Sequence, residues 1–164
     1  MQLNREQRRA LKKAKPSRPG AGHIQLPINM RFSAVDETKL MLEPMKCAER
    51  LRDGAADEGD WHAVILRLNW ARILNKANFD QGEEVIAKAQ DAMRAIKARG
   101  LEYGSWSAST PEFNAIHDAL VICNQMQTMC TRRELRDALQ AVYDQNEYLT
   151  KTQAIKDRLD AAHS

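Results

Sequence analysis

Beyond residue 33, the apolar residues of the chain recur three or four positions apart, which is the spacing of amphipathic α-helices. This pattern predicts five helices, over residues 34–53, 58–77, 81–99, 111–129 and 131–162. Pro44 lies inside the first helix and is expected to kink or split it. We therefore expect an all-α fold, a bundle of about five helices in which short connections favour mostly antiparallel neighbours.

Residues with strong preferences for helix ends mark most of these boundaries. The predicted N-terminal signals are Asp57 with Asp60, Asp80 with Glu83, Thr110 with Pro111, and Thr131 with Glu134. Gly100 is the predicted C-terminal stop of the third helix, and the loop 101–109 follows it. The loop aromatics Tyr103 and Trp106 are expected to pack over the end of the bundle, with ligand binding as the alternative.

Two of the predicted helices differ from the rest. The second is apolar on two faces, which is typical of a central helix, and Trp61 and Trp70 are expected to build the core with the Met/Cys cluster and the Leu and Ile stripes. The last helix, if unbroken, is roughly 45 Å long and would extend beyond a compact bundle. A helix-turn-helix unit over 131–159 is the alternative, and it is disfavoured because residues 140–142 offer no turn.

Residues 23–33 follow a different pattern, in which apolar and polar residues alternate strictly. The apolar positions are Ile24, Leu26, Ile28, Met30 and Phe32. Period two predicts an extended segment with one apolar face, and Pro27 restricts it to an edge strand or an unpaired arm. No second run of this kind occurs in the chain, so the segment either packs against its own bundle or binds another chain.

The formal charge of the 164 residues is +3, and it is unevenly distributed. Residues 1–20 carry a net charge of +6, because they contain one acid, Glu6, and seven cations: Arg5, Arg8, Arg9, Lys12, Lys13, Lys15 and Arg18. The rest of the chain therefore carries −3. Proline and glycine residues end the basic arm, so we predict three parts: a basic arm and linker (1–22), the extended segment (23–33) and a helical bundle domain (34–164).

Candidate chemistry is sparse. The histidines His23, His62, His117 and His163 lie in separate segments without metal-ligand spacing, so no metal site is predicted. Cys123 and Cys130 lie about 10 Å apart along one helix face and read as core residues. The sequence contains neither a phosphate-binding glycine pattern nor a nucleophile elbow, so we predict no cofactor, no small-molecule substrate and no enzymatic activity.

The compartment follows from a few observations. No run of 18 uncharged apolar residues occurs, so no membrane span is predicted. The basic start is not followed by an apolar stretch with a cleavage site, so we expect no secretory signal. Three cysteines in apolar helical contexts fit a reducing environment better than a disulfide framework. These features together predict a cytoplasmic protein.

The leading functional hypothesis is a non-enzymatic protein–protein interaction or assembly module. Its contact surfaces would be the extended segment and the long last helix, and its partner would be another protein or a second copy of the chain. The alternative is a nucleic-acid-binding accessory or regulatory protein, whose basic arm contacts phosphates without reading the bases. The arm contains no aromatic residue on which a base could stack.

Overall fold

The computed structural model describes residues 34–162 and consists there of helices joined by short turns. The helices are α2 (Ala34–Asp53), α3 (Glu58–Asn78), α4 (Glu83–Tyr103), α5 (Thr110–Met129) and α6 (Arg132–Ala162). Within the described range there are five helices and no strand, which confirms the predicted all-α class. The basic arm and the extended segment lie outside the described residues.

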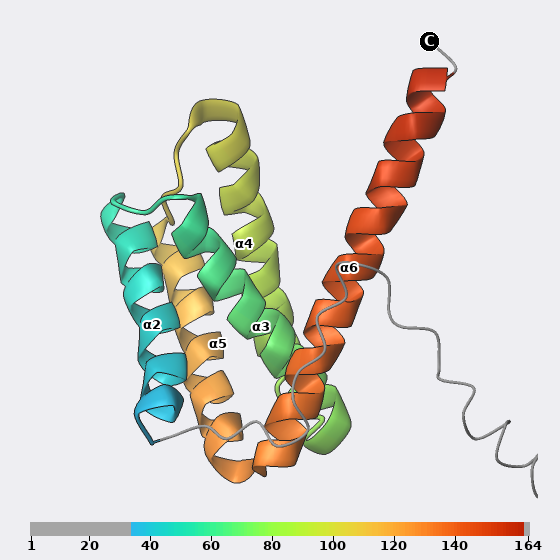
Figure 1. Ribbon diagram of the computed structural model, residues 1–164. Coiled ribbons are helices and arrows are strands. Elements are labelled where there is room, and N and C mark those ends of the chain that lie inside the picture. The colour runs from blue at the N-terminus through green and yellow to red at the C-terminus, as the bar shows by residue number, and fades with distance from the viewer. Residues whose placement is uncertain (1–33, 163–164) are drawn as a thin grey trace, which may run out of the picture.

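Figure 1 shows α2 to α5 side by side, with α6 leaning away from them. The α2–α3 and α4–α5 connections lie at one end of this group, and the α3–α4 and α5–α6 connections lie at the other. The helix α3 packs against each of the other four described helices, as its two apolar faces predicted. None of these helices has the combination of length and apolar character needed to cross a bilayer.

The predicted Asp57 cap and the predicted Thr131–Glu134 capping box are confirmed, and Asp60 completes a box with Asp57 that was not predicted. The Asp60 N–H donates to Asp57 Oδ1 over 3.0 Å, and the Asp57 N–H donates to Asp60 Oδ2 over 3.2 Å. At the start of α6, the Thr131 N–H donates to Glu134 Oε2 over 2.7 Å and the Glu134 N–H donates to Thr131 Oγ1 over 3.3 Å. Each box satisfies N–H groups that would otherwise lack a partner at the helix end.

The predicted Asp80–Glu83 cap is wrong. The N-cap of α4 is Gly82, whose N–H donates to Asn75 Oδ1 over 2.8 Å, and Asp80 adopts a left-handed backbone with φ 60°. The side chain of Glu83 is engaged elsewhere, since it accepts a hydrogen bond from Arg72 Nε over 3.1 Å. The amide of Asn75, which belongs to the preceding helix, therefore organises this turn in place of the carboxylates.

Gly100 does not end α4, which continues to Tyr103 and stops at Gly104 with φ 70°. The reason that glycine occupies position 100 is steric. A Cβ added there would lie 2.5 Å from the ring of Trp106, which packs on this side of the helix. Trp106 is half-buried against the main core, as expected for packing over the bundle end, whereas Tyr103 is exposed.

The structure also tests the effect of Pro44, the start of α5 and the continuity of α6. Pro44 does not split α2, because the buried residues Cys47 and Leu51 keep the following turns packed against the core. The helix α5 is capped by Ser109, one residue before the predicted Thr110, and Glu112 completes the box. The helix-turn-helix alternative is wrong, since α6 is one unbroken helix through residues 140–142.

The described core consists of two clusters that meet at α3. The main cluster joins α2, α3, α4 and α5, and its centre contains fully buried residues such as Leu51, Leu68, Ile96 and Ile116. The second cluster holds α6 against α3: Trp70, Leu74, Leu135, Ala138 and Val142. The polar edges of both predicted core tryptophans are satisfied, because Trp61 Nε1 donates to Met93 O over 2.7 Å and Trp70 Nε1 donates to Leu135 O over 3.0 Å.

Candidate functional site

The helix α6 is attached to the bundle by only part of its length. Its 31 residues correspond to about 46 Å, and among those whose side chains are described the buried ones all lie between Leu135 and Val142. Figure 1 shows the second half projecting away from the other helices. We call residues 143–162 the projecting half of α6. On it, Tyr148 is 69% exposed and Leu149 is 57% exposed.

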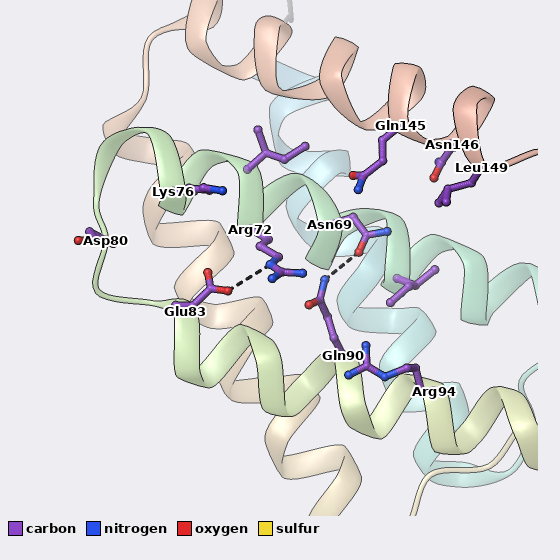
Figure 2. Close-up of a pocket in the computed structure, with 12 residues that line it drawn as sticks. Asn69, Arg72, Lys76, Asp80, Glu83, Gln90, Arg94, Gln145, Asn146 and Leu149 are labelled. Atoms are coloured by element: carbon purple, nitrogen blue, oxygen red, sulfur yellow. Dashed lines mark hydrogen bonds and ion pairs between the residues drawn. The ribbon is translucent and has the colours of Figure 1, made fainter. Parts of the chain in front are cut away.

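A cleft opens where α6 diverges from the bundle. It has a volume of about 640 Å³ and lies between α3, α4 and the projecting half of α6. We call it the polar cleft. Figure 2 shows Asn69 and Arg72 from α3, Gln90 and Arg94 from α4, and Gln145, Asn146 and Leu149 from α6 around it. Three separate helices therefore contribute hydrogen-bonding groups to one concave surface.

Part of this polar lining is already paired within the cleft. Arg72 Nε donates to Glu83 Oε1 over 3.1 Å, and Gln90 Nε2 donates to Asn69 Oδ1 over 2.8 Å, as Figure 2 shows. Asn146, Gln145 and Lys76 supply further amide and ammonium groups. The cleft therefore combines paired polar groups with amide and ammonium groups from all three helices.

A second concavity lies on a different side of α3, between α2, α3 and the first half of α6. Its volume is about 560 Å³, and we call it the Arg67 groove. Its apolar lining consists of Leu40, Pro44, Ala63, Leu66, Trp70 and Leu139. Asp36, Lys39 and Glu43 from α2 also line it, and Arg67 is the charged residue contributed by α3. The groove is thus largely apolar and has one buried cationic side chain.

Arg67 is 4% exposed and has only neutral acceptors. Its Nη2 donates to Gln127 Oε1 over 2.6 Å, to Asn124 Oδ1 over 3.0 Å and to the Cys123 carbonyl over 3.5 Å. Its guanidinium carbon lies 4.7 Å from the centroid of the Trp70 ring, a cation–π distance. Burial lowers the pKa of Arg67, yet an arginine remains protonated at neutral pH.

The charge of Arg67 is uncompensated in the described part of the chain. Every other arginine whose side chain is described lies within ion-pair distance of an aspartate or glutamate. Arg67 has no such partner there, and its Nε–H is buried without a hydrogen-bond acceptor. Buried charges in proteins are normally paired, so this side chain is exceptional within the fold.

The cysteines and histidines form no reactive centre in the described residues. Burial raises the pKa of Cys123 to about 12 and that of Cys47 to about 11, so both thiols stay protonated at neutral pH. His62 is exposed, and the His117 ring lies 5.8 Å from that of Phe113 near the surface. Residues 34–162 contain no group of three or more His, Cys, Asp or Glu side chains arranged to hold a metal ion.

The site residues predicted from sequence lie outside the described part of the chain. These are the apolar positions Ile24, Leu26, Ile28, Met30 and Phe32, and the cations Arg5, Arg8, Arg9, Lys12, Lys13, Lys15 and Arg18. Arg67 was not among the residues predicted from sequence to form a site. A signal for it was present, because Arg67 is the one charged residue in the stretch 63–71 of a helix that is apolar on two faces.

Comparisons of the chain with protein-family models, with curated proteins and with solved structures each find no match.

Proposed function

We propose that the protein is a non-enzymatic protein–protein interaction or assembly module that acts in the cytoplasm. Its contact surfaces are the projecting half of α6 and the extended segment 23–33, and its partner is another protein or a second copy of the chain. The proposal keeps the three-part organisation and the mostly antiparallel order of helices expected from the sequence. The projecting half of α6 is the observation that carries it.

The heptad spacing of α6 gives the physical argument. Leu135 and Val142 are buried against α3, and Leu149 is the next residue at the same seven-residue interval but is 57% exposed. The apolar seam that attaches α6 to the bundle therefore continues past the point where the bundle ends. A short isolated helix is marginal in water, so burial of this seam by a partner would stabilise the projecting half.

The polar cleft supports the same proposal. It places Asn69, Gln90 and Asn146 beside the exposed Leu149. Protein interfaces combine an apolar centre with a polar rim that forms about one hydrogen bond per 100–200 Å². A partner helix lying along α6 would bury Leu149 and meet the amides of the cleft.

The experiment is size-exclusion chromatography with light scattering, combined with purification of the full-length protein from its host. We expect a self-associated species or a copurifying partner, and we expect the double variant Tyr148→Ser/Leu149→Ser to weaken it. The matched control is Leu101→Ser/Tyr103→Ser, which removes two equally exposed apolar residues from α4. A monomeric full-length protein from which no partner copurifies would contradict the proposal.

The extended segment is tested in parallel with a protein that lacks residues 1–32. If the segment contributes to assembly, this shortened protein has a lower mass or loses the partner. An unchanged assembly would assign the contact to α6 alone.

The second candidate function is binding of nucleic acid by the basic arm. The supporting observation is the concentration of +6 in residues 1–20 while the rest of the chain carries −3. Such a distribution favours phosphate contacts by the arm rather than by the bundle, with an affinity that falls steeply as salt increases.

A salt titration of binding to duplex and single-stranded oligonucleotides tests this candidate. Neutralising Arg5, Arg8, Arg9, Lys12 and Lys13 to Gln should abolish the salt-dependent binding, because each phosphate contact contributes to the slope of log affinity against log salt. Unchanged binding by the neutralised protein would exclude the arm as the contact.

A further inference from the structure

The Arg67 groove brings together two features that are normally separate. Its walls are apolar, since Leu40, Leu66, Trp70 and Leu139 line it, and one of its lining residues is a buried arginine without an acidic partner. A guanidinium removed from water loses its hydration and usually regains stability from a carboxylate. Within the described residues, that carboxylate is missing.

The remaining charges along the groove strengthen the argument. Glu43 is paired with Lys46 over 3.2 Å, and Asp36 also has an interaction partner. Lys39, in contrast, forms no ion pair with any described residue. The two acids of the groove are therefore engaged, whereas its two cations, Arg67 and Lys39, have no described carboxylate to neutralise them.

We propose that the Arg67 groove is a binding site for a small apolar carboxylic acid. The carboxylate pairs with Arg67, and the ammonium of Lys39 lies at the rim of the same groove. The apolar body of the ligand packs against Leu66, Trp70 and Leu139. This site is separate from the projecting half of α6, so it goes beyond the proposed function and can fail without affecting it.

Size and chemistry select this class of ligand. A volume of about 560 Å³ lies within the range of small-molecule sites, which are mostly apolar, contain a few polar groups and often lie between the helices of a bundle. Nη2 of Arg67 is already bonded to acceptors of α5, so the carboxylate accepts a charge-assisted hydrogen bond from the remaining N–H groups of the guanidinium. A doubly charged phosphate fits less well, because the groove walls provide little else to replace its water.

The extended segment is a competing occupant, since it precedes α2 directly and its apolar positions alternate. However, residues 23–32 (HIQLPINMRF) contain no acid and include Arg31. Docking of this segment would leave Arg67 uncompensated and would add a further cation. Charge complementarity therefore favours an acidic ligand over this segment.

The experiment is calorimetric titration of the full-length protein with decanoate and, separately, with 1-decanol, which has the same chain length without the charge. We expect decanoate to bind at least about tenfold more tightly than the alcohol, since a hydrogen bond to a charged group is worth roughly one decade or more in affinity. In Arg67→Met, which keeps the apolar stem, the preference should fall to the few fold that Lys39 contributes. The control Arg52→Met alters an exposed arginine of α2 that lines neither concavity and should keep the preference.

Two further variants keep the test decisive if Arg67→Met fails to fold. Ala63→Trp fills the groove and should abolish binding of both probes, and Lys39→Met should reduce the preference for decanoate by a few fold. The proposal is overturned if wild-type protein binds the two probes equally, if it binds neither, or if Ala63→Trp binds decanoate normally. It is also overturned if decanoate binds only after Leu26→Asp/Ile28→Asp, because the extended segment would then be the occupant.

Discussion

At the scale of single residues, Gly100 is the position where local preference and packing conflict. Glycine disfavours the interior of a helix by about 1 kcal/mol relative to alanine. Here the ring of Trp106 occupies the space that a Cβ would need, at 2.5 Å. We expect Gly100→Ala to destabilise the protein by about 1–2 kcal/mol, because the overpacking cost exceeds the gain in helix propensity. Chemical denaturation measures this change.

The control for this prediction is a double-mutant cycle. In a Trp106→Leu background, the ring is absent and Gly100→Ala should be neutral or stabilising. If Gly100→Ala destabilises the protein equally in both backgrounds, the clash with Trp106 is not the reason for the glycine.

Asp60 gives a prediction for the dependence of stability on pH. The hydrogen bond from Arg50 Nε, at 2.9 Å, is the largest cause that lowers the pKa of Asp60, and the Asp57 N–H lowers it further. A carboxyl whose pKa is lower in the folded state stabilises the fold above its unfolded pKa, near about 4. This contribution is lost as the pH falls below that value, through the folded pKa.

We therefore expect Asp60→Asn to lower the free energy of unfolding at pH 7 by about 1–2 kcal/mol and to flatten its decline below about pH 4. Urea denaturation at a series of pH values measures both effects. Asp118→Asn, at an exposed position of α5, serves as the control. If the free energy of unfolding of Asp60→Asn declines below about pH 4 as steeply as that of the wild type, the role assigned to Asp60 is contradicted.

The role of a residue was predictable from sequence where it depends on residues a few positions away. It was not predictable where it depends on residues that are distant in sequence. The Asp57 cap and the Thr131–Glu134 box each depend on residues three positions apart, so the sequence alone indicated them. The role of Gly100 depends on the Trp106 ring in the following loop. The burial of Arg67 against neutral acceptors depends on side chains of α5, which is distant in sequence. Neither could be derived from helical periodicity.

At the scale of elements, α6 has two halves with different energetics. Ala138 is buried in the second cluster, whereas Ala154 is exposed on the projecting half. We expect Ala138→Gly to cost about 2 kcal/mol, from lost helix propensity and a lost buried methyl group. Ala154→Gly should cost less than about 0.5 kcal/mol, because that segment can open without the rest of the molecule.

The measurement is thermal unfolding of both variants, with hydrogen exchange across α6. Amides of the projecting half should exchange faster than those of residues 132–142 in the wild type. Equal costs for the two substitutions would show that α6 behaves as one cooperative unit.

The number and type of elements were predictable because each helix has its own apolar stripe and its own end signals. The exact ends were less predictable. At the α3–α4 turn, the side-chain carbonyl of Asn75 accepts a hydrogen bond from the Gly82 N–H. Asn75 lies seven residues before Gly82, so the residues next to the helix start carry no sequence signal for this cap. In α2, tertiary packing of Cys47 and Leu51 outweighs the helix-breaking tendency of Pro44.

At the scale of the whole molecule, the two clusters predict two levels of stability. Ile116 is fully buried in the main cluster, and Leu135 is buried in the second cluster. We expect Ile116→Ala to destabilise the entire fold by about 2–4 kcal/mol. We expect Leu135→Ala to loosen α6 selectively, so that hydrogen exchange accelerates there while α4 and α5 remain protected. Uniform acceleration in Leu135→Ala would contradict this division.

The overall arrangement was predictable in part. The two apolar faces of α3 indicated a central helix, and the length of α6 indicated an overhang. Which helices surround each concavity depends on packing angles, and those are set by side-chain shapes at helix contacts rather than by the periodicity of one helix. The polar cleft and the Arg67 groove therefore emerged only from the assembled fold.

The attachment of α6 through its first half also has a mechanical consequence. The 20 residues beyond Val142 form a helical lever of about 30 Å, whose pivot lies at the second cluster. A tilt of about 10° at this pivot moves the far tip by about 5 Å over that length. The packing of Trp70 against Leu135 and Val142 therefore sets the range of positions that the tip samples, so a small volume change at Trp70 is amplified far from where it is made.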